Sequence, residues 1–304
     1  MEFERINCCK KQNRQDKFLE KMYKSEAGSL LLKFLTSKAV SEIGGRFMDS
    51  PLSVPAIKPF IEKNNIDMSQ YEDKKYKSYN DFFTRKIKEG ERVFDMTPEL
   101  LCSPCDSKLT VYKIDEKSKY EIKGTKYSFE SLTRSSKLAN YYNGGYMLVF
   151  RLCVDDYHRY AYVDNGKLGP IRRIDGVYHT VNPVAIEAGY DIYKENTREC
   201  SVLHSENFGK ILQIEVGALM VGRIVNNNEK CHVSRGQEKG RFEFGGSTVI
   251  LAFSKDSIKI KDEIINNSKE DYETIVKMGE RIGECKKVKK LFLHSFPHLP
   301  PFTF

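Results

Sequence analysis

No uncharged apolar run in this chain of 304 residues reaches the roughly 18 residues that a membrane-spanning helix needs. The best candidates, residues 216–222 and 245–254, are too short and are interrupted by glycine. The N-terminus is too polar and acidic for a secretory signal, which has an apolar core. From these absences we expect a cytoplasmic protein that does not span a membrane.

The cysteines lack the density of a secreted disulfide framework. Eight of them are spread over the whole chain, so we expect reduced thiols. Cys102 and Cys105 form the only Cys-x-x-Cys, and no second pair accompanies it. A tetrahedral zinc site needs about four ligands. We therefore predict no metal site.

The excess of positive charge is modest. Lys and Arg number 50 against 42 Asp and Glu, which gives a net charge of +8 and a pI near 8.9. A nucleic-acid-binding domain usually has a more basic, clustered surface. Attraction to an anionic membrane surface fits the same charge. Charge alone does not choose between these partners.

The N-terminal third of the chain has the apolar spacing of helices. We predict helices over residues 16–40, 54–64 and 80–88. The stripe in residues 16–40 suits an ordinary core-facing helix, and it also suits a helix that lies on a bilayer with lysines beside its apolar face. The two interpretations are compatible.

From about residue 100 the chain changes to short runs typical of strands, separated by Gly, Asn and Pro. The clearest runs are residues 109–114, 145–154, 210–216 and 241–253. A helical pattern returns only near residues 269–283. We therefore predict an α+β fold, with a helical N-terminal portion followed by a β-rich body.

Gly245 and Gly246 separate two apolar runs and precede Ser247. The ordinary interpretation is a hairpin turn, since two glycines adopt any backbone angle that a turn requires. The alternative is chemical, because a serine after an unhindered glycine can fold its hydroxyl back onto its own peptide bond. Attack on the Gly246 carbonyl would also need an oxyanion donor and a base.

Three polar groups could serve such chemistry, although each has an ordinary structural interpretation. His158 follows a predicted strand beside Asp156 and Arg159, where it is either a satisfied polar group or part of a site for an anionic head group. His179 and Asp106 stand beside predicted turns, where polar residues are common. Taken singly, each signal is weak.

Taken together and in this order, the motifs are specific. The chain resembles the phosphatidylserine decarboxylase family, whose members are proenzymes that make their own pyruvoyl group. The resemblance covers roughly residues 75–283. It rests on blocks that keep the family's order and spacing: NDFFTRK (80–86), SPCDSK (103–108), KGTKYSF (123–129), DYHRY (156–160), YHTVNP (178–183), ENTRE (195–199), FGKILQIEVGALMVG (208–222) and KGRFEFGGSTVI (239–250).

The resemblance implies a self-processing enzyme. Ser247 attacks the Gly246 carbonyl, and elimination of the resulting ester leaves a smaller chain that begins with a pyruvoyl group. An Asp-His-Ser arrangement drives this cleavage in the family, and Asp106 and Ser247 stand at matching positions. The pyruvoyl group replaces pyridoxal phosphate as the electron sink when phosphatidylserine loses carbon dioxide to give phosphatidylethanolamine.

Two positions depart from the family pattern. Ser107 replaces the glycine of the usual Pro-x-Asp-Gly. Ala161 replaces the second histidine of Asp-Tyr-His-Arg-aromatic-His, which is the family's cleavage base, and alanine cannot move a proton. Either the base position is empty and the chain is a cleavage-blocked proenzyme, or His179 is a substitute base. In both cases we expect His158 to serve the decarboxylation, near the charged head of the lipid.

The resemblance also implies partners. They are phosphatidylserine, an anionic membrane surface and a heterodimer of the two cleavage chains, with a homodimer as a further option; we expect no nucleic acid. The expected location is the cytoplasmic side of the cell membrane, as a peripheral protein. Residues 1–95 would form the helical, membrane-associating region, and residues 96–304 the β-rich catalytic domain, cleaved between residues 246 and 247.

Two other functions fit parts of the pattern. A Ser-His-Asp hydrolase would use the same residue types, with Ser247 as the nucleophile of an uncleaved chain. A non-catalytic homologue that binds acidic lipid would account for Ala161. Intact mass combined with a turnover assay separates all three.

Overall fold

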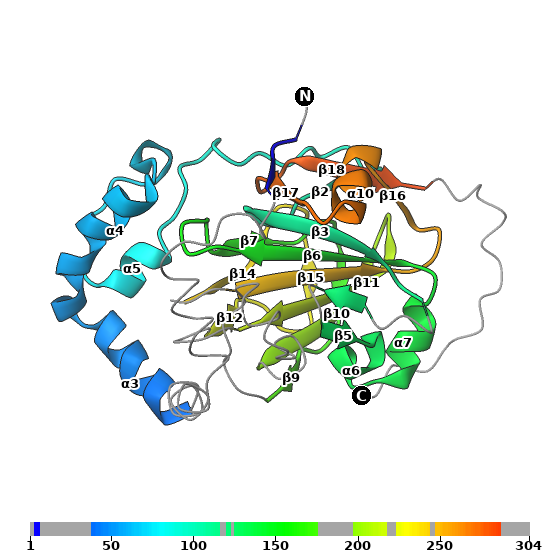
Figure 1. Ribbon diagram of the computed structural model, residues 1–304, viewed down its shortest axis with the longest axis horizontal. Coiled ribbons are helices and arrows are strands. Elements are labelled where there is room, and N and C mark those ends of the chain that lie inside the picture. Colours follow the sequence, from blue (N-terminus) through cyan, green and yellow to red (C-terminus); the bar gives the residue numbers. More distant parts are fainter. Residues whose placement is uncertain are drawn as a thin grey trace.

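The computed structural model describes residues 3–6, 38–115, 120–122, 125–175, 197–217, 223–243 and 247–286. Its N-terminal part is helical and the remainder is rich in strands, which confirms the predicted α+β class. Figure 1 shows the N-terminal helices along one side of the strand-rich body. The helix predicted over residues 16–40 lies almost entirely outside the described residues.

The N-terminal helices pack around one aromatic cluster. They are α3 (Lys38–Asp49), the 3-10 helix η1 (Pro51–Ala56), α4 (Ile57–Asn64), the 3-10 helix η2 (Met68–Gln70) and α5 (Tyr79–Phe83). The Ser78 hydroxyl caps α5 by accepting a hydrogen bond from the Asp81 N–H. Phe60 of α4 meets Tyr79 and Phe82 edge to face, which joins α4 to α5.

The helix predicted over residues 80–88 ends early, at Phe83. Thr84 and Arg85 turn toward the strand-rich body instead. There the Thr84 carbonyl accepts hydrogen bonds from the Arg159 guanidinium, and Arg85 donates to the Asp155 carbonyl. These long-range contacts override the local helical pattern.

The largest sheet has ten strands and is antiparallel throughout. Its order is β1-β17-β3-β6-β15-β11-β10-β8-β13, with β9 beside β10. These strands are β1 (Arg5–Ile6), β3 (Ser107–Lys113), β6 (Tyr146–Leu152), β8 (Gly166–Leu168), β9 (Arg172–Ile174), β10 (Arg198–Ser205), β11 (Gly209–Val216), β13 (His232–Val233), β15 (Ser247–Phe253) and β17 (Glu273–Val276).

Smaller sheets accompany it. One has the order β12-β14-β7, and another has the order β16-β18-β2. Their strands are β2 (Leu100–Cys102), β7 (Arg159–Ala161), β12 (Ile224–Asn226), β14 (Glu238–Phe242), β16 (Ile258–Ile260) and β18 (Arg281–Cys285). A separate ribbon pairs β4 (Tyr120–Ile122) with β5 (Thr125–Tyr127).

The large sheet buries both of its faces, because successive strand residues point to opposite sides. One face packs on α6 (Phe129–Thr133) and α7 (Ser136–Tyr142). The other face packs on side chains of the two three-stranded sheets, among them Tyr160, Phe242 and Ile282. We call the packed region between the large sheet and strands β7 and β14 the inter-sheet layer.

The helix predicted near residues 269–283 is wrong. The helix there is α10 (Asp262–Lys269), which ends where the prediction begins, and β17 and β18 follow it. Glu273 explains the error, since it is buried in β17 and accepts two hydrogen bonds from the Arg151 guanidinium. A buried charged residue in a strand as short as β17 removes the apolar alternation by which a strand is identified. Helices α6 and α7 are a further departure from the prediction.

The hairpin interpretation of residues 241–253 is also wrong. β14 pairs with β12 and β7, whereas β15 pairs with β11 and β6. The strands before and after Gly245 and Gly246 therefore belong to two different sheets. Among the described residues, no helix is both long and apolar enough to cross a bilayer.

Gly145 lies in a tightly packed turn just before β6, so a substitution there tests the packing. A Cβ there would lie 1.8 Å from the Phe253 carbonyl oxygen and 2.8 Å from that of Tyr142, both of them backbone atoms. We expect Gly145→Ala to lower the free energy of unfolding by about 1–3 kcal/mol, because the two chain segments must separate. Gly44→Ala in α3 is the matched control, because no atom outside its own helix lies within 4 Å of an added Cβ. Urea unfolding that shows equal losses for the two variants would contradict this account.

Candidate active site

Ser247 is the first residue of β15, a strand with a neighbour on each side. It lies opposite Leu152 of β6. Its side chain shares a face with Val249 and Leu251, which belong to the core of the inter-sheet layer. The residue is fully buried, and its Oγ has no hydrogen-bond partner in the part of the chain that the structure describes. An unpaired buried hydroxyl costs about 1–3 kcal/mol, so such a group calls for an explanation, and a catalytic role is one.

The second buried polar side chain is that of His158. It lies between β6 and β7, two residues before Tyr160, and its carbonyl accepts a hydrogen bond from the Phe242 N–H of β14. The imidazole is fully buried, and its Nδ1 lies 2.9 Å from the Asp156 carbonyl oxygen. That oxygen can only accept, so Nδ1 carries the proton and Nε2 keeps a lone pair. Among the described residues nothing binds Nε2.

Burial, with the nearby Arg85 charge as the second cause, lowers the pKa of His158 to about 3. The imidazole is therefore neutral across the physiological range. It is a proton acceptor at Nε2 and cannot serve as a permanent cation for an anionic head group.

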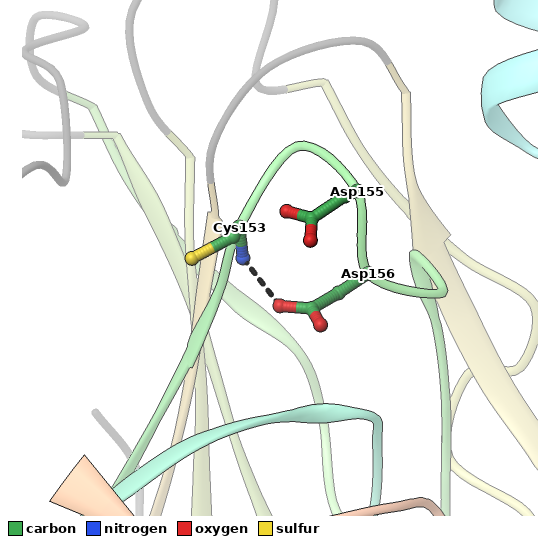
Figure 2. A group of neighbouring side chains, drawn as sticks. All are labelled: Cys153, Asp155 and Asp156. Carbon is green, nitrogen blue, oxygen red and sulfur yellow. Dashed lines mark hydrogen bonds between the residues drawn. The ribbon is translucent and has the colours of Figure 1, made fainter. Parts of the chain in front are cut away.

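An ion pair holds the loop that carries His158. Lys108 of β3 places its Nζ 2.8 and 2.7 Å from the two carboxylate oxygens of Asp156. Burial would lower the pKa of Lys108, but the facing Asp156 carboxylate raises it, so the amine stays charged. The Cys153 N–H donates to the same carboxylate at 2.7 Å (Figure 2).

The side chains of Cys153, Asp155 and Asp156 gather on this loop (Figure 2), and their possible ligand atoms lie within 4.8 Å of one another. Asp156 is already paired with Lys108, and the Cys153 Sγ accepts a hydrogen bond from the Arg151 guanidinium at 3.0 Å. We therefore assign this group to an ion-pair network. Cys102 and Cys105, for which no metal was predicted, are buried free thiols.

Asp106 lies in the turn before β3. It is 2% exposed, and Arg92 donates to both of its oxygens, from Nε at 2.9 Å and from Nη2 at 2.7 Å. The Met278 N–H also donates to it, at 2.8 Å. Burial would raise the pKa of Asp106, but the Arg92 hydrogen bonds, with the Lys277 and Arg92 charges, hold it below its ordinary value.

Position 161 lies beside the turn of Asp106. The Ala161 N–H donates to the Pro104 carbonyl at 2.9 Å. Lys108 and Thr248 both lie opposite Arg151, so β3 and β15 flank β6 at this end of the sheet. Two strand spacings amount to about 10 Å, which is the span between the backbones of these outer strands.

The described residues therefore place Ser247 at the start of β15, His158 against Phe83 just before β7, and the backbone of Ala161 against the turn that carries Asp106. Gly246 and His179 lie outside the described residues. The roles assigned to these residues remain predictions.

The family model for phosphatidylserine decarboxylase matches residues 79–284. The chain is 48% identical over 273 residues to phosphatidylserine decarboxylase proenzyme 2 of Clostridium acetobutylicum, covering 90% of this chain and 92% of that protein. It is 44% identical to the proenzyme of Ruminiclostridium cellulolyticum, with coverages of 88% and 91%. Its identity to a Clostridium botulinum proenzyme is 45%, with coverages of 89% and 94%.

The chain belongs to the phosphatidylserine decarboxylase family. Membership confirms the resemblance seen in the motifs, and it confirms the prediction of a decarboxylase enzyme. The match runs from α5 to β18, so it takes in Asp106, the loop of His158 and Ser247.

Several residues around the site of this phosphatidylserine decarboxylase family member were not predicted. Arg92 binds Asp106, and Lys108 binds Asp156. Phe83 and Arg85 contact the loop of His158. Three of these four stand inside the quoted blocks NDFFTRK and SPCDSK, so the motif signal was present. Their partners could not be read from it, because each contact joins residues that lie far apart in the chain.

The pairing of Arg92 with Asp106 gives a stability prediction. Arg92→Met should lower the free energy of unfolding at pH 7 by about 3–5 kcal/mol, because it leaves a buried carboxylate without its main partner. The folded-state pKa of Asp106 lies below its ordinary 3.8, so the pair stabilises the fold above about pH 4 and the effect is lost as the pH falls. Urea unfolding at pH 7 and pH 3.5 should therefore show a smaller difference between wild type and variant at the lower pH.

Arg281→Met is the control, because Arg281 pairs with Glu284 on the surface, where the two side chains are 47% and 39% exposed. An exposed pair of this kind contributes about 0–1 kcal/mol. Equal losses for the two arginine variants would contradict a special role for the buried pair.

Proposed function

We propose that this chain decarboxylates phosphatidylserine to phosphatidylethanolamine, using a pyruvoyl group that it makes from Ser247. The observation that carries the proposal is the buried Ser247 hydroxyl at the start of β15, which, like the Nε2 of His158, has no hydrogen-bond partner among the described residues. The printed names of the relatives, which are phosphatidylserine decarboxylase proenzymes, support the same reaction.

The cleavage step needs only atoms of this chain and one water molecule. The Ser247 Oγ bonds to the Gly246 carbonyl carbon, the peptide C–N bond breaks, and the nitrogen of residue 247 leaves as an amine. A base then removes the Cα proton of residue 247, which expels Gly246 as a carboxylate. The remaining unsaturated residue takes up water and releases ammonia, which leaves the pyruvoyl group. No external oxidant or reductant enters this balance.

The pairing of the strands is compatible with cleavage before Ser247. Cleavage before Ser247 would transfer β15, β16, α10, β17 and β18 to the smaller chain. β15 stays bonded to β6 and β11, β17 to β3, and β18 to β2, all of them strands of the larger chain. The two cleavage chains should therefore remain a heterodimer.

In the decarboxylation, the pyruvoyl group supplies the carbonyl that accepts the electron pair released with carbon dioxide. The residues around Ser247 fit a reaction that consumes a charged carboxylate. Leu152 and Val249 exclude water there, and a dry surrounding disfavours the carboxylate relative to neutral carbon dioxide. His158, neutral and with its lone pair on Nε2, is the group that would handle the proton.

The cleavage step also needs a base. Ala161 stands beside the turn of Asp106, where the family pattern has a histidine. We propose that this chain is a slowly cleaving or blocked proenzyme for that reason.

Intact mass tests the proposal. Ala161→His should accelerate cleavage into residues 1–246 and 247–304 by about 10²–10⁴-fold, the usual contribution of a general base. Ser247→Ala in the same background should stay full length, because a methyl group cannot attack. Phosphatidylethanolamine formation should follow cleavage and be abolished by hydroxylamine, which blocks carbonyl groups, while chelators should leave it unchanged.

Other outcomes assign other roles. Rapid cleavage of the unmodified chain, lost in His179→Ala, would make His179 the base. Turnover by a chain that remains intact would favour the hydrolase. Lipid binding without turnover, even with histidine at position 161, would favour the non-catalytic homologue.

We also propose that the N-terminal helices meet an anionic lipid surface on the cytoplasmic side. Phe47 of α3 is 50% exposed and Leu52 of η1 is 77% exposed, and both lie close together in sequence. Phe47→Ser with Leu52→Ser should weaken co-sedimentation with phosphatidylserine vesicles by about tenfold or more, since burying each side chain contributes about 1.5–3 kcal/mol.

Val93→Ser is the control for this measurement, because Val93 is 69% exposed but lies outside these helices. Binding should also fall with salt, since basic side chains near the surface contribute about 1 kcal/mol each. Unchanged binding by the double variant would place the anchor elsewhere in the chain.

A further inference from the structure

Arg85 is a buried cation without an acidic partner in the described part of the chain. It is 2% exposed, and its guanidinium lies between two rings, 4.3 Å from the Tyr71 centroid and 4.9 Å from that of Phe82. Its Nη2 donates to the Tyr71 hydroxyl and to the Asp155 carbonyl, each at 3.2 Å. Its Nε and Nη1 bind nothing among the described residues. Burying an uncompensated charge is unfavourable, so other contacts of the folded chain must offset the cost of burying Arg85.

Residues 83–85 all contact the loop that carries His158. Phe83 packs on the imidazole, with ring centroids 4.0 Å apart and an angle of 38° between the planes. The Thr84 carbonyl accepts two hydrogen bonds from Arg159. Residues 83–85 thus contact Asp155, His158 and Arg159, on both sides of the imidazole along the chain.

We propose that Phe83 and Arg85 are positioning residues for His158: Phe83 excludes water from the imidazole, and Arg85 binds the loop of His158 and places a fixed positive charge on it. The imidazole then keeps its proton on Nδ1 and its lone pair on Nε2. The value of this for catalysis rests on the proposed function, whereas the protonation state itself does not.

The charges that face His158 support the assignment. Arg85 approaches from the end of α5 and Lys108 from β3, and both disfavour the imidazolium. On its own loop, the Asp156 carbonyl favours it, but the Asp156 carboxylate is neutralised by Lys108. From β14, Glu238 is paired with Arg159 and so brings no free negative charge.

The burial of the ring and the Arg85 charge therefore act in the same direction. Phe83 is fully buried and covers one face of the imidazole, so it supplies part of the desolvation that is the main cause of the low pKa. Arg85 adds a fixed positive charge whose effect is not cancelled by a carboxylate. A neutral, correctly oriented base in a dry layer is what a proton transfer at Nε2 requires.

The test is nitrogen NMR of the full chain labelled at its six histidines, with His158 assigned by His158→Gln. In wild type we expect the neutral Nδ1–H form from pH 8 down to pH 4.5. Arg85→Gln should raise the pKa of His158 by about 1 unit or more, so that protonation begins within this range, because a like charge has been removed. Arg85→Lys keeps the charge and should keep the wild-type titration, and Arg281→Gln is the control on an exposed arginine.

An unchanged His158 titration in folded Arg85→Gln would overturn the proposal. So would an equal shift in Arg85→Lys, because that would show that only the shape of the guanidinium matters. If Arg85→Gln does not fold, Phe83→Leu decides: its His158 pKa should rise as water reaches the ring, and an unchanged value would overturn the proposal. None of these readouts needs turnover, so a failure of the proposed reaction is detected separately, by the mass and product assays.

Discussion

The position of β15 between β6 and β11 is the constraint on which the rest of the site depends. Its backbone is bonded on both sides from Thr248 to Ala252, so the strand can neither rotate nor slide without breaking two ladders. The pleat then determines where the first side chain points, and that side chain is Ser247. A small polar group is thereby held in the apolar inter-sheet layer, where water does not compete for it.

Several charged groups of the described residues are buried in pairs that connect distant parts of the chain. Arg92 joins the segment before β2 to Asp106, Lys108 joins β3 to the loop of His158, and Arg151 joins β6 to Glu273. Removing one partner from such a pair is expensive, because the other charge remains buried. The pairs therefore fix the relative positions of segments whose apolar packing alone would tolerate small shifts. Arg85 is the exception among the buried cations around His158, because it has no acidic partner among the described residues. Its positive charge therefore acts on the imidazole instead.

The helical N-terminal part and the strand-rich body are connected through a few specific contacts. The aromatic cluster of α4 and α5 continues through Phe83 onto His158, so the same short helix belongs to the helical layer and to the wall of the site. A surface that meets lipid through α3 and η1 would thus be joined to the imidazole by packed side chains. The strand-rich body likewise continues across the proposed cleavage point, since its ladders, and not the peptide bond before Ser247, hold β15 in place.

The sequence by itself determined the fold class, the central strands β3, β6 and β11, and the family, because regular apolar alternation and ordered motifs are local properties of the chain. It also singled out Ser247, His158 and Asp106, although their roles remain predictions. Only the tertiary structure decided that Asp106 binds Arg92, that His158 is buried against Phe83, and that residues 273–276 and 281–285 form strands. It also decided that β14 and β15 belong to different sheets. The physical reason is the same in each case: periodicity reports which side of a segment is buried, whereas the partner it is buried against depends on residues elsewhere in the chain.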